Sequence, residues 1–225
     1  MTVDFQQLRV KMVDGQVRTT DVTQVNLLSA LLSVPREEFV PEERRVIAYI
    51  DEDLEVAPAA DGHEARYLME PSPFAKLVQL AEIRESDRVL DVACGTGYSS
   101  AVLARIAREV IALESIAPVA AQAKEILAAQ GVSNVEVVEG PLAAGYAAKA
   151  PYDVIVINGA VDEVSQTLID QLAKGGRLVT VLGQGNAARA MIYVKDHEGL
   201  VSARSAFNAA VRPLAEFARV PAFEF

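Results

Sequence analysis

A regular alternation of strand-like and helix-like segments, beginning near Asp87, is the feature that most constrains the fold of this chain. Short apolar runs alternate with segments of helical spacing, and such alternation predicts a parallel sheet with helices on both faces. The runs that read as strands are residues 88–93, 109–115, 134–140, 152–159 and 177–183, and helices are expected over 99–108, 118–131 and 164–176. Residues 188–195 and 200–207 are joined by a short turn, and they predict an antiparallel hairpin at the sheet edge.

The first 85 residues follow a different pattern. Helical spacing predicts a helix over 22–34, helical turns over 35–54 and a further helix over 74–83, whereas the Pro- and Ala-rich residues 55–73 are expected to be irregular. Long irregular segments in compact proteins often face the substrate, although packing alone explains this one equally well. We therefore predict one compact unit made of a helical N-terminal extension with a substrate-facing loop, residues 1–85, and a core, residues 86–225.

Composition argues against several kinds of site. The net charge of −10 argues against a surface that binds nucleic acid phosphates. Cys94 is the only cysteine, and His63 and His197 are the only histidines, which excludes an internal disulfide and metal sites built on these residue types. The N-terminal residues lack the apolar core of a signal peptide, and no apolar run reaches the ~20 residues of a membrane span. The sequence thus predicts a cytoplasmic protein that binds neither nucleic acid nor membrane, with its oligomeric state left open.

The segment VLDVACGTGYSS, residues 89–100, indicates where a ligand would bind. It joins a strand to a helix through a Gly-x-Gly turn, which offers backbone N–H groups to a ligand. Gly95 and Gly97 match the first two glycines of the dinucleotide-binding fingerprint, but Ser100 stands at the third position. Glu114 ends the next strand, where a carboxylate can accept hydrogen bonds from both hydroxyls of a ribose. Together, the loop and this acid favour a nucleoside site over a plain turn beside a solvated strand end.

Two nucleoside classes fit such a site, a dinucleotide such as NAD and S-adenosylmethionine. NAD enzymes usually have the third glycine, and the start of their helix faces a pyrophosphate. S-adenosylmethionine has no phosphate, and Asp91 offers a carboxylate where its cationic amino-acid portion would lie. The sequence therefore favours S-adenosylmethionine as the cofactor, with a helix-capping role for Asp91 as the simpler alternative.

In these residues the chain resembles the protein-L-isoaspartate O-methyltransferases. The similarity covers most of the chain and includes the segments MVDGQVRTTDV, LLSVPREEFVPE, AYIDEDLEV, RVLDVACGTGYSSAVLA, NVEVVEG, APYDVIVINGA and LIDQLAKGGRLVTVLG. VPREEFVP is the specific part, since many methyltransferases share the glycine motif. The resemblance implies an α/β, Rossmann-like sheet of seven strands whose last strands are antiparallel, with isoaspartyl-containing proteins or peptides as substrates.

The resemblance also implies the residues of the site. Asp91 to Gly97 would border the methionine portion of the cofactor, and Glu114 the ribose. Asn158 joins the site because it follows an apolar strand, at the end where ligands collect in open α/β sheets. The expected cofactor-binding residues are Asp91, Val92, Ala93, Cys94, Gly95, Gly97, Glu114, Ser115, Gly140, Pro141, Leu142 and Asn158. The expected substrate-binding residues are Tyr67, Leu68 and Met69, and no metal is expected.

Two departures from the family pattern bear on the substrate and on the adenine. The family carries Gly-Gln-Thr-Ile-Ser before Gln-Pro, with its Thr and Ser at the substrate carboxylate, whereas this chain reads ARYLMEP. Tyr67 and Met69 stand at the Thr and Ser positions, and a thioether cannot donate the hydrogen bond of a hydroxyl. Glu70 adds a negative charge near an anionic substrate. Pro141 stands where the family has an Asp that resembles an acceptor for the adenine amino group.

The implied chemistry needs few reactive side chains. A carboxylate is already a nucleophile at pH 7, so methyl transfer to it requires in-line positioning and a dry site rather than a general base. Losing one orienting hydroxyl would then raise the activation free energy by about a few kcal/mol, which weakens the activity rather than abolishing it. We expect Cys94 to be a small tolerated loop residue and His63 to be a surface residue.

Three functions agree with the sequence. The first is carboxyl O-methylation of isoaspartyl residues in damaged proteins, with weakened activity. The second keeps the cofactor and changes the acceptor, as the altered ARYLMEP segment suggests. The third is a non-catalytic relative that uses the fold for binding or regulation, as the loss of the family's Ser and Asp suggests.

Overall fold

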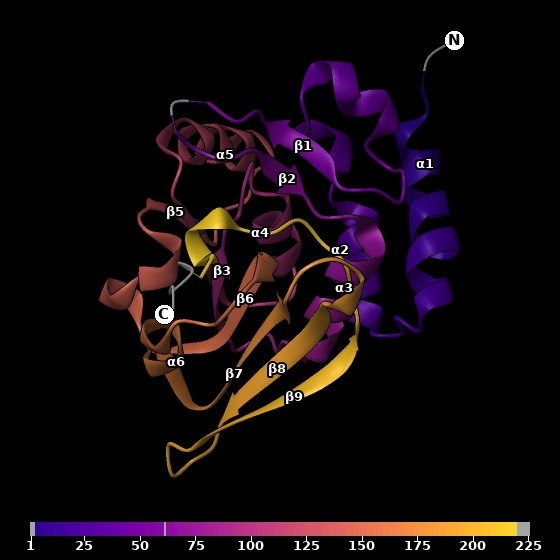
Figure 1. Ribbon diagram of the computed structural model, residues 1–225. Helices are drawn as coiled ribbons and strands as arrows, with labels where there is room; N and C mark the ends of the chain where they lie inside the picture. The colour runs from indigo at the N-terminus through magenta and orange to yellow at the C-terminus, as the bar shows by residue number, and fades with distance from the viewer. Residues whose placement is uncertain (1–2, 61, 220–225) are drawn as a thin grey trace.

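The computed structural model describes residues 3–60 and 62–219 (Figure 1). Residues 1–2 of the predicted extension, Asp61 within it and residues 220–225 of the predicted core lie outside the described part. The N-terminal part contains helices α1 (Phe5–Met12), α2 (Val25–Ser33) and α3 (Pro71–Leu80), and strands β1 (Leu54–Ala57) and β2 (Arg66–Leu68). Short 3-10 helices cover Arg36–Phe39 and Glu42–Ile47, in agreement with the helical turns predicted for this segment.

A seven-stranded sheet forms the centre of the molecule. Its strands are β3 (Arg88–Val92), β4 (Glu109–Glu114), β5 (Val135–Glu139), β6 (Tyr152–Val161), β7 (Leu172–Leu182), β8 (Arg189–Lys195) and β9 (Val201–Asn208). They lie in the order β5-β4-β3-β6-β7-β8-β9. The first five are parallel, whereas β8 and β9 are antiparallel to their neighbours. The predicted α/β sheet with antiparallel last strands is confirmed.

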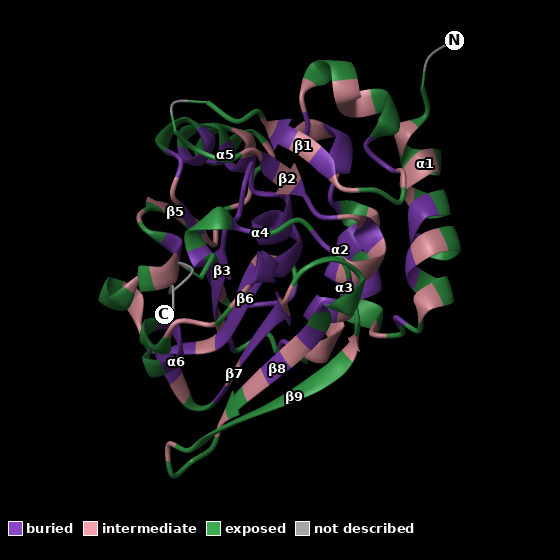
Figure 2. Ribbon diagram, viewed as in Figure 1, coloured by how far each residue is buried: buried purple, intermediate pink, exposed green. Residues whose placement is uncertain are grey.

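Alternate residues of the central strands point to opposite faces of the sheet, as the period of a strand requires. Val89 of β3 belongs to one buried apolar cluster and Leu90 to another. Helices α4 (Tyr98–Leu103) and α5 (Ala117–Ala129) and the N-terminal helices contribute to the first cluster, and α6 (Gln166–Asp170) to the second. In Figure 2, β3 and β6 are buried and the edge strand β9 is exposed along most of its length. Burial on both faces explains why the central strands read as continuous apolar runs.

Two expectations about local structure were wrong. Residues 55–73 are only partly irregular, because β1 and β2 pair antiparallel, with Val56 and Leu68 buried, and α3 begins at Pro71. The helix expected over 164–176 ends at Asp170. The carbonyl of the next residue, Gln171, accepts a hydrogen bond from the amide of Tyr152 at 2.9 Å, so the chain leaves the helix there and continues as β7.

The segment after β9, residues 209–219, lies along the carboxyl end of β6. The amide of Ala160 donates to the carbonyl of Arg212 at 2.9 Å, and the amide of Leu214 donates to the carbonyl of Ala160 at 2.8 Å. One helical turn, η8 (Ala215–Phe217), follows. In Figure 1 this yellow turn lies near β5 and the top of β3, far from the end of β9. The segment therefore crosses the edge of the sheet where the predicted site lies.

Within the described residues, no helix has the length and apolar composition needed to cross a membrane. No group of three or more potential metal-ligating side chains gathers there either.

Candidate nucleoside site at the carboxyl edge of the sheet

The predicted site lies where β3 and β4 end side by side. Asp91 pairs in register with Ala112, and the loop that follows β3 is fastened to the neighbouring strand by a hydrogen bond from the Cys94 amide to the Leu113 carbonyl at 3.2 Å. Asp91 and Glu114 are both completely buried. The strand ends thus bring two carboxyl groups to one edge, as the sequence predicted.

The two glycines of the loop adopt backbone conformations that disfavour other residues. Gly95 has φ +56° and Gly97 has φ +96°. A Cβ atom on Gly97 would lie 3.0 Å from Leu127 of α5, whereas one on Gly95 would meet only Val56, at 3.8 Å. The second glycine therefore serves the packing of α5 against the loop.

Asp91 is held by three neutral donors. Its Oδ2 accepts hydrogen bonds from the hydroxyls of Ser99, at 2.7 Å, and Ser100, at 2.5 Å, and its Oδ1 accepts one from the amide of Asn158. Burial raises the pKa of Asp91 to about 6, although these hydrogen bonds act in the opposite direction. The carboxyl group is therefore ionised at neutral pH without a cation among these donors.

Asn158 lies at an irregularity in β6, between Val156 and Ala160, where the pairing with β7 shifts. Such irregularities re-aim side chains, and here the amide turns toward Asp91. Its Oδ1 atom is buried and has no hydrogen-bond partner among the described residues. A buried acceptor of this kind is rare in native proteins and is a candidate contact for a ligand donor.

Glu114 has a cation beside it. Its Oε1 accepts from the Nε of Arg66 at 3.0 Å and from the backbone amides of Ser115 and Ile116 at 2.9 and 3.1 Å. Its Oε2 accepts from the amide of Gly95 at 3.0 Å. The carboxylate that the sequence assigns to a ribose is thus already paired with a buried guanidinium.

Arg66 extends this contact to the segment after β9. Its Nη2 donates to the hydroxyl of Ser115 at 2.8 Å and to the carboxylate of Glu216 on η8. Ser115 in turn donates to Glu216 at 2.8 Å. We call Arg66, Glu114, Ser115 and Glu216 the Arg66 cluster.

Charge pairing inside the Arg66 cluster moves two pKa values. Burial alone would lower the pKa of Arg66, but the carboxylates of Glu114 and Glu216 raise it above its ordinary value. Burial would raise the pKa of Glu216, but the hydrogen bond and charge of Arg66 outweigh it and bring that pKa below its usual value. Both groups are therefore charged at neutral pH.

Cys94 faces this edge as an inert thiol. It is buried, and burial together with the charges of Asp91 and Glu114 raises its pKa well above the usual value. The thiolate required of a nucleophile does not form at neutral pH. This agrees with the expectation of a small tolerated loop residue.

The predicted substrate residues lie beside the predicted cofactor residues. Tyr67, Leu68 and Met69 share a small cavity with the loop residues Ala93 and Cys94. Phe74, Tyr98, Ser99 and Asn158 complete its lining. Its volume is about 10 Å³, no more than one water needs. Side chains from the N-terminal part and from the sheet thus meet at one point, in a nearly closed space.

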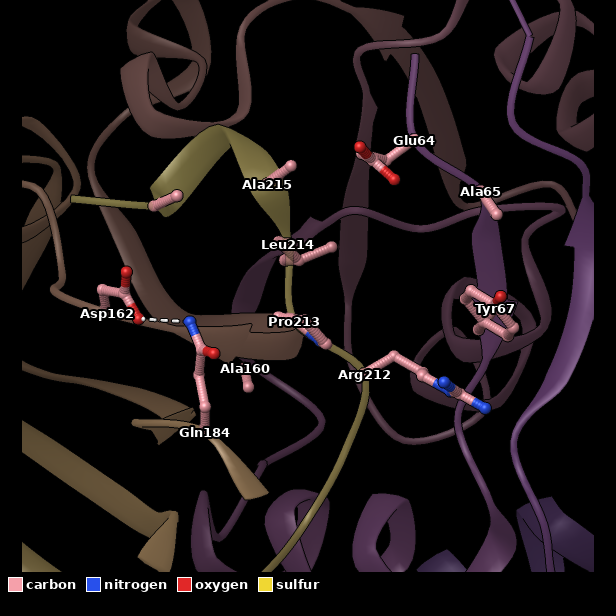
Figure 3. A pocket seen from close by; sticks show the side chains of 11 residues that line it. Glu64, Ala65, Tyr67, Ala160, Asp162, Gln184, Arg212, Pro213, Leu214 and Ala215 are labelled. Atoms are coloured by element: carbon pink, nitrogen blue, oxygen red, sulfur yellow. Dashed lines mark hydrogen bonds between the residues drawn. The ribbon is translucent and has the colours of Figure 1, made fainter. Parts of the chain in front are cut away.

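A larger cavity opens next to it, with a volume of about 360 Å³ (Figure 3). Its wall includes Tyr67 and Glu64 on one side, Asp162 and Gln184 on another, and the segment from Arg212 onward between them. The guanidinium of Arg212 lies over the ring of Tyr67 at 4.7 Å. The tyrosine at the family's Thr position thus places a cation at the rim of this cavity.

Glu70, which replaces the family's Gln, lies near other acids. Its amide donates to Asp53 at 2.9 Å. Burial, followed by the charges of Asp53, Asp51 and Glu52, raises the pKa of Glu70 to about 7. The negative charge expected near the substrate is therefore only partly present at neutral pH.

Three further predicted residues, Gly140, Pro141 and Leu142, follow the end of β5. The amide of Gly140 donates to the carbonyl of Glu114 at 3.1 Å, and Pro141 is exposed. Leu142 is completely buried in the apolar cluster that contains Leu113 and Ala93. Val92, at the end of β3, accepts a weak hydrogen bond from Asn158 at 3.3 Å. His63 is exposed, as expected.

Four residues of the hydrogen-bond network around Asp91 and Glu114 were not predicted from the sequence. Ser99 and Ser100 lie in the first turn of the helix that follows the glycine loop, and two hydroxyls so close to the end of the strand that holds Asp91 were the available signal. Arg66 stands at the Gln of the family's Gly-Gln-Thr-Ile-Ser segment, and that substitution was the available signal. Glu216 gave no signal, because its partner lies 150 residues away in the sequence.

Comparison with known proteins identifies the family. Residues 8–217 match the family described as protein-L-isoaspartate(D-aspartate) O-methyltransferase. The protein-L-isoaspartate O-methyltransferase of Methanoculleus marisnigri is 39% identical over 175 residues, which are 78% of this chain and 77% of that protein. Protein-L-isoaspartate O-methyltransferase 1 of Rhodopseudomonas palustris is 37% identical over 84% of this chain and 74% of that protein.

Solved structures agree with this match. A protein-L-isoaspartate O-methyltransferase superposes with a TM-score of 0.76 at 25% identity, covering 94% of this chain and 66% of that chain. A Plasmodium falciparum structure in complex with S-adenosyl-L-homocysteine superposes with a TM-score of 0.75 over 96% of this chain and 100% of that chain. Its identity of 16% supports the fold alone. Given the extent of the family match, the chain belongs to the protein-L-isoaspartate(D-aspartate) O-methyltransferase family.

Proposed function

We propose that this chain transfers a methyl group from S-adenosylmethionine to the carboxylate of isoaspartyl residues in proteins. Family membership makes it an S-adenosylmethionine-dependent methyltransferase. The observation that carries the proposal is the meeting of Asp91 and Asn158 with Met69 and its neighbours at the carboxyl edge of the sheet.

The residues around Asp91 suit the amino-acid portion of the cofactor. The buried carboxylate has only neutral donors around it, and a ligand ammonium would supply the missing positive charge. The unpartnered Oδ1 of Asn158 offers an additional acceptor nearby. S-adenosylmethionine, when bound, supplies a methyl group on a sulfonium, which a carboxylate can attack directly.

The chain's own contribution to the reaction is positioning and exclusion of water. Met69, Phe74 and Tyr98 give the small cavity an apolar wall, and all three are buried. A carboxylate acceptor that approaches this apolar wall through the larger cavity would lose water, which strengthens its attack. Arg212, in the wall of the larger cavity, offers a positive charge that can orient an anionic acceptor.

A second acceptor class is supported by Tyr67 and Met69. Met69 lacks the hydroxyl that the family pattern has at the substrate carboxylate, and Tyr67 offers a phenol whose ring lies under Arg212. A different carboxylate, on a small molecule or a protein, is therefore the alternative substrate of the same site.

The test is transfer of a labelled methyl group to a synthetic isoaspartyl peptide. The aspartyl peptide of the same sequence is the matched control, because it differs only in which carboxyl group joins the chain. Label in the isoaspartyl peptide alone supports the proposal. Label in neither peptide, but in small carboxylic acids, supports the second acceptor class, and no label above the no-enzyme background argues against both.

The site of action and the remaining partners are part of the same proposal. We place the protein in the cytoplasm, acting on damaged proteins and not on nucleic acid or membranes, in agreement with a net charge of −10. Cell fractionation followed by detection of the chain in the cytosolic fraction tests the location.

A further inference from the structure

The ribose-binding acid of the proposed site is engaged by the protein itself. Glu114 is completely buried, and Arg66 contacts it with a side chain that is 3% exposed. A ribose hydroxyl must donate to the same carboxylate oxygens, and Oε1 already accepts from Arg66 and from two backbone amides. Oε2 accepts only from the Gly95 amide, whereas Oε1 has three donors, so a ribose that donates to both oxygens can reach Oε1 only after Arg66 leaves.

The cation that engages Glu114 is held from the other side by the C-terminal segment. Glu216 lies on η8, and its carboxylate accepts from both Arg66 and Ser115. Leu214 and Phe217 flank it and are buried in the apolar cluster that also contains Leu142 and Leu113. The turn that presents Glu216 is therefore docked on the residues that the sequence assigns to the nucleoside.

We infer that the Arg66 cluster is a latch that competes with the nucleoside: cofactor binding at Glu114 requires Arg66 to leave and η8 to detach. The inference rests on the proposed function, since it takes Glu114 as the ribose acceptor. It goes further by coupling the affinity for the cofactor to the position of the C-terminal segment. Two elements far apart in sequence, β2 and η8, thereby control one carboxylate.

Conformational selection relates the latch to the affinity for the cofactor. When only a small fraction of molecules has the binding-competent form, the apparent affinity for the ligand falls by that fraction. Any substitution that opens the latch raises the fraction and tightens binding without adding a contact to the ligand. A residue that merely supports the fold would have the opposite effect, because its loss would loosen the site.

The experiment measures S-adenosylhomocysteine affinity by calorimetry for the full chain and for three variants. Arg66→Gln removes the competing cation and is expected to bind about tenfold more tightly than the original chain. Glu216→Gln leaves the Arg66–Glu114 pair in place and is expected to bind about threefold more tightly. Glu109→Gln is the matched control for Glu216→Gln. Glu109 pairs with Arg88, and its side chain is 33% exposed, close to the 31% of Glu216. It lies at the start of β4, at the opposite end of that strand from Glu114.

A second measurement follows the turn directly. The amides of Phe217 and Ala218 donate to Leu214 and Ala215 at 3.0 Å within η8, and hydrogen exchange reports whether these bonds open. Saturating S-adenosylhomocysteine is expected to speed exchange at these amides in the original chain, although ligands ordinarily slow it. Should Arg66→Gln fail to fold, Glu216→Gln and the exchange experiment still decide the question.

The outcomes separate the latch from the proposed function. Equal affinity in the original chain, Arg66→Gln and Glu216→Gln, or slower exchange in η8 on binding, overturns the latch and leaves the methyltransferase proposal standing. No binding in any variant overturns both, because Glu114 would then hold no nucleoside even when freed.

Discussion

Asp91 and Glu114 are buried to the same degree at the ends of neighbouring strands, yet their surroundings differ in charge. Asp91 accepts from two hydroxyls and an amide, all neutral. Glu114 accepts from a guanidinium as well as from backbone amides. A buried carboxylate without a counter-ion suits a cationic ligand, whereas one with a counter-ion is already satisfied. In the proposed cofactor site, Asp91 can therefore accept a ligand cation directly, whereas Glu114 must first lose the contact with Arg66.

The largest change in stability is expected on substitution of Arg66. Arg66→Met leaves Glu114 buried without its counter-ion and is expected to lower the free energy of unfolding by about 3–5 kcal/mol in urea denaturation. The double variant Arg66→Met/Glu114→Gln should recover most of this loss. Arg18→Met, at an exposed ion pair with Asp14, should change stability by less than about 1 kcal/mol. If Arg66→Met lowered the free energy of unfolding as little as Arg18→Met, the Arg66–Glu114 ion pair would contribute nothing measurable to stability.

Asp91 should matter for ligand binding. Asp91→Asn keeps the shape of the side chain and removes its charge, so the affinity for S-adenosylhomocysteine is expected to fall about 100-fold, close to the ~3 kcal/mol of a charge-assisted contact. Calorimetric titration measures this change. Asp170→Asn, at an exposed position in α6, is the control and should bind like the original chain. Unchanged affinity in Asp91→Asn would remove Asp91 from the cofactor site.

The same residue predicts a pH dependence of binding. Because the pKa of Asp91 is raised to about 6, its carboxyl group gains a proton as the pH falls through that value and no longer attracts a ligand cation. Affinity for S-adenosylhomocysteine should therefore drop by about tenfold between pH 7 and pH 5. Titrations at both values test this, and the drop should be absent in Asp91→Asn. A profile that is flat in the original chain would contradict it.

The smallest expected effect concerns Glu70. Its raised pKa, about 7, means that the folded state holds the proton more tightly than the unfolded chain, so stability falls as the pH rises toward and through 7. Glu70→Gln should therefore be more stable than the original chain at pH 8, by about 1 kcal/mol after allowance for solvent screening, and similar at pH 4. Thermal unfolding at both values measures it. Glu85→Gln, at an exposed position, should show no such difference.

The core of the fold could be predicted because its signals are local. Strands β3, β4 and β6 are continuous apolar runs, and α5 stops where Gly131 follows with φ +66°. The two errors, β1–β2 and the end of α6, arose where pairing with distant residues decides the structure. Three residues of β2 carry too little alternation to be read as a strand without their partner.

The site was predictable to the same extent. Asp91, Glu114 and Asn158 follow apolar runs, and strand ends of a parallel sheet meet at one edge. The partners of these residues were not predictable, since Arg66 reaches Glu114 from 48 residues away. The positions of the two carboxylates could thus be predicted from sequence spacing, but their hydrogen-bond and ion-pair partners could not.

The span of the contact between Arg66 and Glu216 has a consequence for the order of folding. The two residues are 150 positions apart, and contacts of such separation form late because they close a very long loop. The sheet edge with Asp91 and Glu114 needs only local strand–helix–strand pairing and can assemble earlier. We therefore expect pulse-labelling hydrogen exchange during refolding to protect the amides of β3 and β4 before those of η8.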